Sequence, residues 1–395
     1  MPALIDVLVT FVVVTSGVIL SALVLYQWVL ALASLFPCKR QAVASAPLYR
    51  FAFVVPAHNE ESGIAATVQS LLNVDYPRSL FEVVVVADNC SDSTAEMARG
   101  AGARCLERVD VSLRGKGYAL RHAFAQLLAE EFEAFVVVDA DSVVTANFLS
   151  VINARLGAGD QVIQSYYGVS NPDASIMTYL LQVGNLIENR LYWEAKQLLG
   201  LPIFLRGNGM CFRKDVLQRY PWGAFTITED TEYGLMLVAN GIPVQFAPEI
   251  GVYAYQPETL EQAFAQRVRW AAGNASLTKG KAAELIWSGL VGKDLSSFDL
   301  GISLVAGSRP LMLISNVALA GICGILKKPG LLTWAGIIFI GQLSYIGLGV
   351  ALNGLSVQKM YRLFLSPIYL LWLCFISILG AAGFRKNQWV RTKRT

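Results

Sequence analysis

Apolar residues form very long uninterrupted runs at both ends of the chain and short runs between them. Residues 3–36 contain one acidic residue, Asp6, and no basic residue, which predicts a membrane-spanning helix. A cleaved signal peptide is the alternative, but this run is too long and lacks a basic N-terminal region. We therefore expect residues 1–40 to form a retained transmembrane anchor.

The C-terminal part of the chain, residues 300–385, is also mostly apolar and predicts two or three transmembrane helices. Arg309 and Pro310 interrupt the first candidate span, so that span could lie partly in the membrane interface. The candidate spans are at about 303–326, 331–353 and 363–384.

An amphipathic stretch precedes these spans at residues 281–299 and contains Trp287. Such a stretch is typical of a helix that lies on the membrane surface.

The middle region, residues 48–280, alternates short apolar runs of β type with segments of helical periodicity. This alternation predicts an α/β domain with a parallel sheet and right-handed crossovers. Ser91 or Asp92 is the expected N-cap of one helix, and Thr228 of another. We expect strands at 51–55, 82–86, 135–138, 161–168 and 243–246, and helices at 62–72, 93–100, 117–131, 174–199, 228–239, 258–273 and 282–295.

Polar residues follow three of these strands: a loop at 56–60, Asp88, and the pair Asp139 and Asp141. The carboxyl ends of parallel strands share one edge of a sheet, where α/β proteins bind their ligands. Two carboxylates one residue apart can hold a hard divalent cation against the phosphates of a substrate. The pattern therefore predicts a nucleotide site, although polar turns would also explain each loop taken alone.

Composition supports a membrane protein, because only 15% of the 395 residues are charged and 54% are hydrophobic. Soluble domains carry about 25% charged residues. The net charge of +3 gives no reason to expect a nucleic-acid partner. Six cysteines without a CxxC pair and only two histidines make a zinc site or an oxidising compartment unexpected.

Basic residues gather in two places, Lys39 and Arg40 after the first span and the tail at residues 386–395. Both are typical of cytoplasmic flanks, so we expect an integral plasma- or inner-membrane protein with a cytoplasmic catalytic domain. Three full C-terminal spans would place the tail on the opposite side. The sequence therefore leaves the topology open.

Five motifs, in order, resemble those of membrane-integrated family 2 glycosyltransferases with a GT-A fold, the group of cellulose, hyaluronan and chitin synthases. The resemblance covers about residues 50–275. It implies a Rossmann-like nucleotide-sugar domain flanked by transmembrane helices. The motifs are Val55-Pro56-Ala57-His58-Asn59-Glu60, Asp88, Asp139-Ala140-Asp141, Thr228-Glu229-Asp230 and Gln266-Arg267-Val268-Arg269-Trp270.

The resemblance also implies roles for single residues. Asp139 and Asp141 would hold Mg²⁺ or Mn²⁺, and Asp230 would be the general base, with Glu229 raising its pKa by like-charge repulsion. The diphosphate and the acceptor would meet Gln266, Arg269 and Trp270. The implied donor-binding residues are Pro56, Asn59, Glu60, Asp88, Lys116, Asp139 and Asp141.

Simpler explanations exist for some of these side chains. Asp88 could cap a helix, Glu229 and Asp230 could stabilise a helix N-terminus, and Trp270 could be a packing residue. Residues 388–394 resemble the gating segment of processive synthases, but a plain basic tail would look the same.

The resemblance implies an inverting hexosyltransferase that moves a sugar, expected to be UDP-linked, to a growing β-linked polysaccharide. The alternative within the class is transfer of one sugar to a lipid. A more remote alternative is a membrane transporter or receptor with an α/β sensor domain. The expected partners are the nucleotide-sugar donor, a polysaccharide or lipid acceptor, and membrane lipids. A second copy of the chain, as a homo-oligomer, or an export protein is a further candidate partner.

Overall fold

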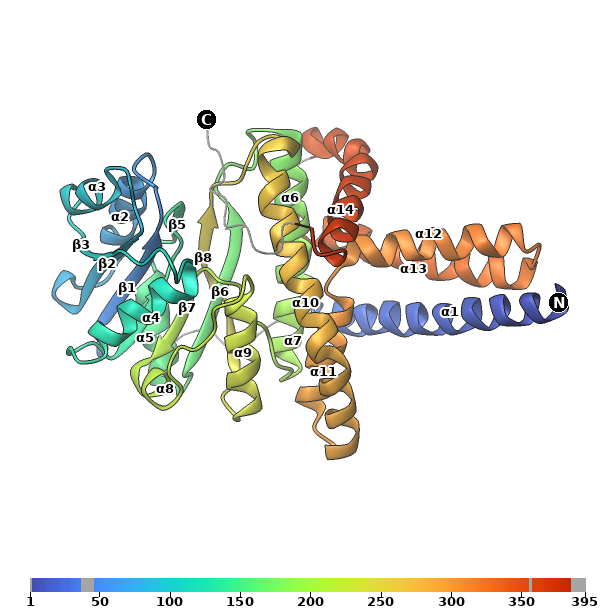
Figure 1. The fold of residues 1–395 in the computed structure, drawn as a ribbon, viewed down its shortest axis with the longest axis horizontal. Coiled ribbons are helices and arrows are strands. Elements are labelled where there is room, and N and C mark those ends of the chain that lie inside the picture. The colour runs from blue at the N-terminus through green and yellow to red at the C-terminus, as the bar shows by residue number, and fades with distance from the viewer. Residues whose placement is uncertain (1, 37–45, 355–356, 385–395) are drawn as a thin grey trace.

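The computed structural model describes residues 2–36, 46–354 and 357–384, and it places an α/β domain beside a group of long apolar helices (Figure 1). The two basic segments of the sequence, at 38–40 and 386–395, lie outside the described residues. The expectations for those segments therefore stay predictions.

A mixed eight-stranded sheet forms the centre of the domain, in the order β3-β2-β1-β4-β7-β6-β8-β5. The pairs β1–β2 and β1–β4 are parallel, as the alternating pattern predicts, and β3, a strand that was not predicted, pairs parallel with β2. The second half differs, because β7 pairs antiparallel with both β4 and β6, and β5 pairs antiparallel with β8. The strands are β1 Phe51–Ala57, β2 Phe81–Asp88, β3 Arg104–Arg108, β4 Ala134–Val137, β5 Ser142–Val144, β6 Val162–Val169, β7 Met210–Arg213 and β8 Val244–Ala254.

The sheet is buried on both faces because its central strands carry apolar side chains at successive positions. In β1, Phe53 belongs to the hydrophobic layer on one face and Val54 to the layer on the other. Helices α4 and α9 contribute to the layer of Val54, and α2 and α5 contribute to the layer of Phe53. A strand buried in this way must end where it meets solvent, which fixes the position of the loop that follows it.

Helices surround the sheet, and most of them follow the predicted positions. The expected helix at 174–199 contains a π-helical turn, η2, between α6 and α7. Turns of this type inside helices are frequent near functional sites. The helices of the domain are α2 Ile64–Leu72, η1 Arg78–Leu80, α3 Thr94–Gly100, α4 Lys116–Leu127, α5 Phe148–Gly157, α6 Ile176–Glu188, η2 Asn189–Glu194, α7 Ala195–Leu198, α8 Lys214–Arg219 and α9 Glu229–Ala239.

The helices expected at 258–273 and 282–295 are one continuous helix, α10 (Leu260–Gly292). The prediction of a break near Gly273 was wrong, because this glycine serves a close contact rather than a helix end. A Cβ atom at Gly273 would lie 2.8 Å from Cγ2 of Thr228. Thr259 caps the start of α10 in a capping box with Gln262.

Within the part of the chain that the structure describes, three segments are long and apolar enough to cross a membrane: Asp6–Ala33, Pro329–Leu352 and Gln358–Ala381. The span expected at 303–326 is divided instead into α11 and α12, which meet at an angle of 67°. Pro310 at the start of α12 explains the break, because proline lacks an N–H group and favours the first turn of a helix. These elements are α1 Pro2–Ala33, α11 Leu295–Ala306, α12 Arg309–Ile325, α13 Pro329–Leu352, η3 Val357–Leu365 and α14 Ser366–Ala381.

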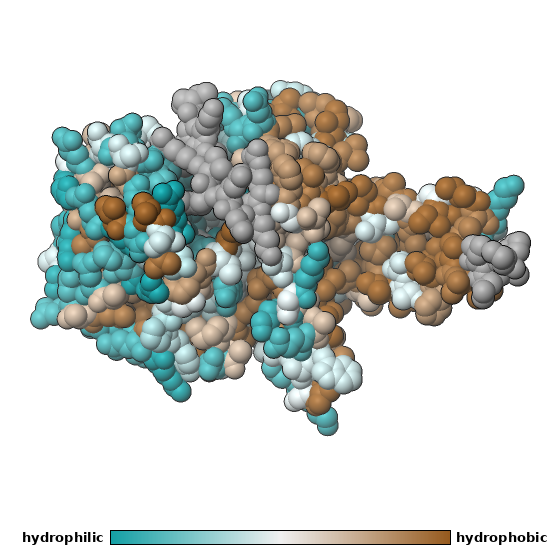
Figure 2. All heavy atoms as spheres, in the orientation of Figure 1, coloured by the Kyte–Doolittle hydropathy of each residue, from teal (hydrophilic) through white to brown (hydrophobic). Residues whose placement is uncertain are grey.

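Helices α1, α12 and α13 pack side by side and project away from the domain (Figure 1). Apolar side chains from the three helices fill the space between them, among them Leu20, Met312 and Ile338. Figure 2 shows that the outer surface of this three-helix bundle is also largely apolar.

Candidate active site

The loops after β1 and β2 lie against each other at the carboxyl edge of the sheet. His58 Nδ1 lies 2.7 Å from the backbone oxygen of Asp88, and the side-chain oxygen of Asn59 accepts a hydrogen bond from the backbone N–H of Ser91. Asn59 itself has a left-handed backbone (φ 57°), which asparagine tolerates better than most residues. The Thr94 hydroxyl accepts the backbone N–H of Glu60 at 2.7 Å.

Asp88 lies at the end of β2 and is only 1% exposed. Its Oδ1 atom is 2.5 Å from Nη1 of Arg108, a residue that the sequence analysis did not single out. Its Oδ2 atom is buried and has no hydrogen-bond partner among the described residues. A buried carboxylate oxygen without a donor can accept a hydrogen bond from a ligand.

The helix that follows this loop begins one residue later than expected. Ser93, rather than Ser91 or Asp92, is the N-cap of α3, and its side chain makes no capping hydrogen bond. The Asp92 carboxylate still accepts the backbone N–H of Thr94 at 3.0 Å. Asp88 makes no such bond, so the idea that it caps a helix gains no support.

Two hydrogen bonds from Asn208 hold the loop that carries Asp139 and Asp141 in place. The side-chain oxygen of Asn208 accepts the backbone N–H of Asp139 at 3.1 Å, and its amide group donates to the Ser142 hydroxyl at 2.8 Å. Ser142 in turn donates to Oδ1 of Asp141 at 3.0 Å. Asn208 is 1% exposed, and its two contacts fix the spacing of the two carboxylates.

Asn208 can reach this position because of the glycine that follows it. Gly209 has φ +67°, and a Cβ atom there would lie 2.0 Å from the Ser165 hydroxyl oxygen. The backbone N–H of Gly209 donates to the oxygen of Val137 at the end of β4. The sequence signal for this arrangement was the Gly-Asn-Gly tripeptide, and its meaning depends on the antiparallel pairing of β7 with β4.

Lys116, at the start of α4, contacts both the loop that carries Asp139 and Asp141 and the loop that contains Gly207. Its Nζ atom is 2.5 Å from Oδ1 of Asp139 and donates to the backbone oxygen of Gly207. Burial alone would lower the pKa of Lys116, but the carboxylates of Asp139, Glu229 and Asp230 outweigh it and raise the pKa. Lys116 is therefore a fixed positive charge within a group of three acids.

Glu229 and Asp230 form the first turn of α9. A Cβ atom at Gly207 would lie 3.0 Å from Oδ2 of Asp230, so this carboxylate faces Gly207 and the Lys116 ammonium group. The other carboxylate oxygen of Asp230 accepts the backbone N–H of Thr231 at 2.7 Å. This contact is expected if Asp230 merely stabilises the start of a helix. Thr228 occupies the N-cap position as predicted, but its side chain makes no capping hydrogen bond.

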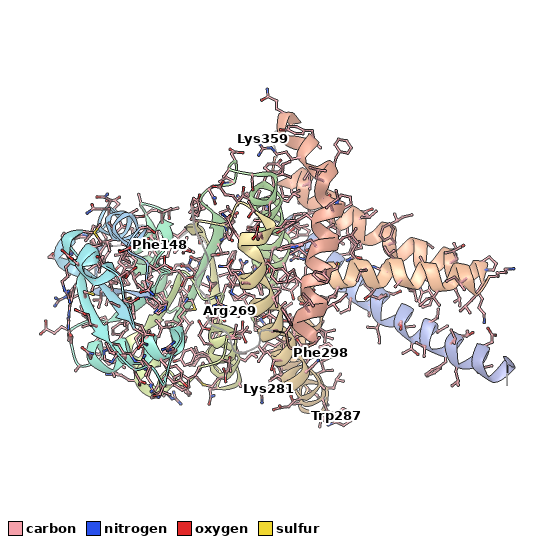
Figure 3. The ribbon with its side chains drawn as sticks, turned by 45° about the horizontal axis from the view of Figure 1, so that its top comes forward. Phe148, Arg269, Lys281, Trp287, Phe298 and Lys359 are labelled. Carbon is pink, nitrogen blue, oxygen red and sulfur yellow. The ribbon has the colours of Figure 1, made fainter. Side chains whose placement is uncertain are left out.

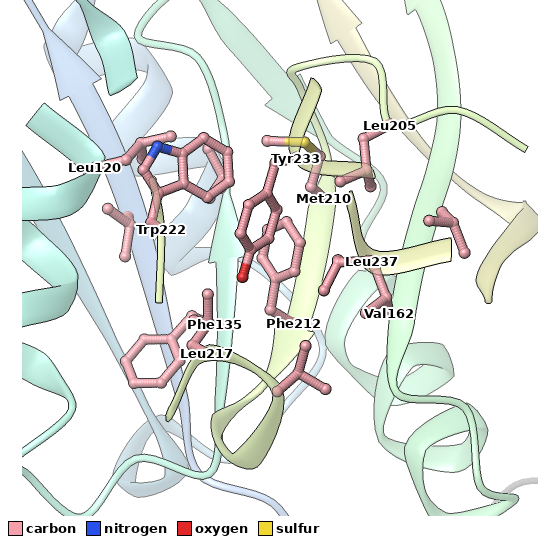
Figure 4. Close-up of a cluster of buried hydrophobic side chains, with 14 of the residues drawn as sticks. Leu120, Phe135, Val162, Leu205, Met210, Phe212, Leu217, Trp222, Tyr233 and Leu237 are labelled. Carbon is pink, nitrogen blue, oxygen red and sulfur yellow. The ribbon is translucent and has the colours of Figure 1, made fainter. Parts of the chain in front are cut away.

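Helix α9 is held in place by Tyr233, one turn beyond Glu229. The Tyr233 ring packs against Trp222 and Phe212, with centroid distances of 4.4 and 5.7 Å (Figure 4). Its hydroxyl donates to the backbone oxygen of Tyr220. This aromatic group therefore fixes the direction in which the first turn of α9 presents its carboxylates.

Burial raises the pKa of both acids. The pKa of Glu229 rises from 4.5 to about 8, first because the side chain is buried and then because of the Asp230 charge. Burial likewise raises the pKa of Asp230, against the opposing effect of Lys116. At neutral pH the pair therefore keeps a proton, and we assign that proton to Glu229.

This proton predicts how stability depends on pH. Between pH 4.5 and about 8 the folded protein retains a proton on Glu229 that the unfolded chain releases, so stability should fall as pH rises through this window. We expect Glu229→Gln to remove that slope, leaving the variant more stable than the wild type at pH 9 by on the order of a few kcal/mol. Thermal unfolding of both proteins in detergent at pH 6 and pH 9 measures the difference. An equal difference in stability between the wild type and the variant at pH 6 and at pH 9 would contradict the raised pKa of Glu229.

Helix α10 brings the last predicted motif to the same place. Burial lowers the pKa of Arg269, and the charge of Glu229 opposes this effect, which places the two residues near each other. Figure 3 shows Arg269 on the side of α10 that faces the sheet. The Oε1 atom of Gln266 is buried without a partner among the described residues, and the Trp270 ring lies under the guanidinium group of Arg267 at 4.9 Å.

The contact between α10 and the loop before α9 yields a second prediction. Gly273→Leu would push its side chain into Ile227 and Thr228, displacing Glu229 and Asp230. Overpacking costs about 1–3 kcal/mol, and we expect at least a tenfold loss of transfer rate with retained folding. The control is Gly280→Leu in the same helix, because nothing lies within 4 Å of a Cβ at Gly280. Equal rates for the two variants would show that this contact does not position the acids.

A second group of polar residues, around Arg206, lies next to the loop that carries Asp139 and Asp141. Arg206 donates to the side-chain oxygen of Asn189 at 2.9 Å and lies 3.4 Å from Glu188. Its guanidinium group is also 5.3 Å from the centroid of the Tyr167 ring. Burial, followed by the charges of Asp141 and Asp139, raises the pKa of Tyr167 to about 12.

The described residues contain no group of three or more His, Cys, Asp or Glu side chains close enough to hold a metal ion. Asp139 and Asp141 supply two hard carboxylates, and the Asp139 side chain is 37% exposed. This donor set fits Mg²⁺ or Mn²⁺, because such ions commonly take one or two carboxylates and complete their shell with phosphate oxygens and water.

A mixed sheet with carboxylates at its open edge, beside Lys116 and an acidic helix start, defines the class of GT-A glycosyltransferases. The chain matches the model of the glycosyltransferase-like family 2 over residues 47–273, and it belongs to that family.

Two curated relatives illustrate the range of the family. The chain is 30% identical over 239 residues to a β-monoglucosyldiacylglycerol synthase of Trichormus variabilis, covering 56% of this chain and 48% of the relative. It is 26% identical over 265 residues to a poly-β-1,6-N-acetyl-D-glucosamine synthase of Staphylococcus epidermidis, covering 64% and 60%. The chain thus spans about half to three fifths of the length of these relatives.

A solved structure shows the same fold over nearly the whole chain. It is a mannosyltransferase of Pyrobaculum calidifontis in complex with GDP-mannose and Mn²⁺. The match has a TM-score of 0.56 at 18% identity and covers 96% of this chain and 99% of that one.

Proposed function

We propose that this protein is an inverting glycosyltransferase that takes a sugar from a nucleotide-sugar donor, UDP-linked by our expectation, at the membrane surface. The observation that carries the proposal is the grouping of Lys116, Asp139, Glu229 and Asp230 around Gly207. One fixed cation and a pair of acids with different protonation states are what a general-base transfer to a diphosphate-linked donor requires.

In this proposal Asp230 takes the proton of the acceptor hydroxyl while that oxygen attacks C1 of the donor sugar. The bond from C1 to the diphosphate breaks as the new glycosidic bond forms, and the nucleoside diphosphate leaves. Lys116 and Arg269 would contact the diphosphate. Glu229 stays protonated at neutral pH and so keeps a second negative charge away from the departing phosphate.

Asp139 and Asp141 would hold Mg²⁺ or Mn²⁺, which neutralises the charge that develops on the leaving diphosphate. The bound Mn²⁺ of the mannosyltransferase named above is consistent with this choice. Asp88, with its free buried oxygen, would accept a hydrogen bond from the nucleobase, and the loop of Pro56, Asn59 and Glu60 would lie beside it.

Two acceptors are open, a growing β-linked polysaccharide and a lipid, and one observation favours the lipid. Apolar side chains fill the interior of the bundle formed by α1, α12 and α13, and this packing leaves a polymer no path between those helices. A channel could still form with a second copy or an export partner. A lipid acceptor needs neither.

The proposal is tested by nucleoside diphosphate release from the full-length protein in nanodiscs. A panel of UDP- and GDP-sugars is offered with Mg²⁺ or Mn²⁺, and the labelled product is then analysed. A product that partitions into organic solvent would establish glycolipid synthesis, and a high-mass product would establish a polymer synthase. Absence of metal-dependent release with every donor would overturn the proposal.

A further inference from the structure

The segment Gln358–Ala381, which comprises most of η3 and all of α14, qualifies as a membrane span by length and composition. Its start is nevertheless attached to the α/β domain. Lys359 Nζ lies 2.6 Å from Oδ1 of Asp173, in the loop before α6. A little further along, Tyr369 packs against Met177 and Ala263.

The end of this segment is attached to α10, the helix that packs on the loop before α9 of the α/β domain through Gly273. Lys279 Nζ, on α10, donates to the backbone oxygen of Ala381 at 2.9 Å. A Cβ atom at Gly380 would lie 2.6 Å from Cβ of Ala271, so the two helices touch closely there. A segment of 24 residues is about 36 Å long as a helix, enough to carry its far end across a bilayer. Since its start contacts the domain and its end contacts α10, α14 runs along α10 and not away from it.

Helix α10 is too polar to lie in hydrocarbon. Over the stretch that contacts α14 and just beyond it, α10 carries Arg267, Arg269, Lys279, Lys281 and Glu284. Charged residues within the bilayer core are costly and rare. Figures 1 and 3 show α14 running beside α10 and across the direction of α1, α12 and α13.

The face of α14 opposite to α10 is apolar and exposed. Ile368, Leu371, Phe375 and Ile378 are 62%, 64%, 52% and 54% exposed, and their spacing of three and four residues places them on one side of the helix. Figure 2 shows that the apolar surface continues from this region onto the three-helix bundle. A membrane that surrounds the bundle therefore reaches this side of α14.

We propose that α14 lies flat in the boundary between lipid headgroups and acyl chains, and that among the described residues only α1, α12 and α13 cross the bilayer. The occupant of the exposed face of α14 is thus the lipid surface. On this arrangement the ion pair between Lys328 and Asp6, at 3.1 Å, marks the opposite surface of the membrane.

Two consequences follow for the protein as a whole. The chain returns to the side of the α/β domain after α13, so the described residues that flank the two basic segments, Phe36 and Phe384, lie on one side of the membrane, and the positive-inside rule favours basic residues on that side. Helix α10, with Gln266, Arg269 and Trp270, is also placed at the membrane surface, where a lipid would present its headgroup.

The side of the C-terminus can be tested with the full-length chain in sealed membrane vesicles. One epitope is added after Thr395, a second is inserted at Val109, which is 84% exposed on the α/β domain, and a third at Lys327 in the turn between α12 and α13. Antibody binding is compared before and after detergent. We expect the first two epitopes to be accessible from the same side and the third from the other. A C-terminal epitope that appears together with the one at Lys327 would overturn the proposal.

The depth of α14 gives a second test that needs no insertion. Spin labels are placed at Leu371→Cys in α14 and at Ile337→Cys in α13, both of which are 64% exposed. Cys38, Cys90 and Cys105 are replaced by serine in both variants. The label at 371 should be quenched by a water-soluble nickel reagent at least several-fold more than the label at 337. Equal protection of the labels at 371 and 337 from nickel would show that α14 crosses the bilayer. This outcome does not depend on which substrate the enzyme uses.

Discussion

The variant Asp230→Asn should lose transfer activity by about 10²- to 10⁴-fold, the range that a positioned general base contributes. The amide is nearly the same size as the carboxylate but cannot accept the proton of the acceptor hydroxyl. Oδ1 of the asparagine can still accept the backbone N–H of Thr231, so the start of α9 should remain folded. The rate is measured as nucleoside diphosphate release with saturating donor.

Donor affinity separates this role from a purely structural one. Asp230 lies near Lys116 and Gly207, but the amide of the variant is nearly the same size as the carboxylate. We therefore expect nucleotide binding, measured by calorimetry, to change less than threefold in the variant. The matched control is Glu232→Gln in the same first turn, because Glu232 is bound to Thr226 and not to the Lys116 group. A loss of donor affinity as large as the loss of rate would show that Asp230 is not the base.

The variant Asp141→Asn should weaken metal-dependent donor binding by at least tenfold. An amide oxygen is a poorer ligand for Mg²⁺ or Mn²⁺ than a carboxylate, and the described residues place no third carboxylate where it could share one ion with Asp139 and Asp141. The asparagine oxygen can keep the hydrogen bond from Ser142, so the loop should hold its shape. Titration of Mn²⁺ by electron paramagnetic resonance, with and without nucleotide, measures the effect without relying on turnover.

The control for this change is Asp215→Asn, which removes a carboxylate of α8 that pairs with Arg213 on the surface. We expect it to leave Mn²⁺ and nucleotide binding within twofold of the wild type. If Asp141→Asn and Asp215→Asn bind Mn²⁺ equally well, the proposed metal role of Asp141 is wrong.

The prediction for Asp141 depends on an arrangement in which one buried amide sets the distance between two half-buried acids, Asp139 and Asp141. Asn208 contacts Asp139 directly and Asp141 through Ser142, and it is itself held by Gln164, whose side chain donates to its backbone oxygen at 2.8 Å. Gln164 also accepts the backbone N–H of Arg206 at 2.8 Å. The loop that carries Asp139 and Asp141 and the loop that begins at Arg206 are therefore parts of one hydrogen-bond network.

The sequence by itself determined the first half of the domain and the residues at its edge. Continuous apolar runs become strands buried on both faces, and such strands must end where they meet water, so Asp88 and Asp139 were placed correctly by a local rule. The alternation of strands and helices predicted the parallel pairing of β1 with β2 and with β4. Hydropathy alone likewise located α1 and α13.

Contacts between distant parts of the chain decided the rest. Arg108 and Asn208 look like ordinary polar residues until β3 and β7 pair beside β2 and β4 and bring them against Asp88 and Asp139. Gly273 resembles a helix end in the sequence, but the packing of α10 on the loop before α9 makes it the residue that allows close approach.

Helix α14 shows the limit most clearly. An apolar helix that crosses a membrane and one that lies on its surface can have the same length and composition, so the sequence left between two and three C-terminal spans. The contacts of Lys359 with Asp173 and of Lys279 with Ala381 attach the start of this segment to the α/β domain and its end to α10. Only tertiary structure contains that information, because the direction of a helix depends on what holds its two ends.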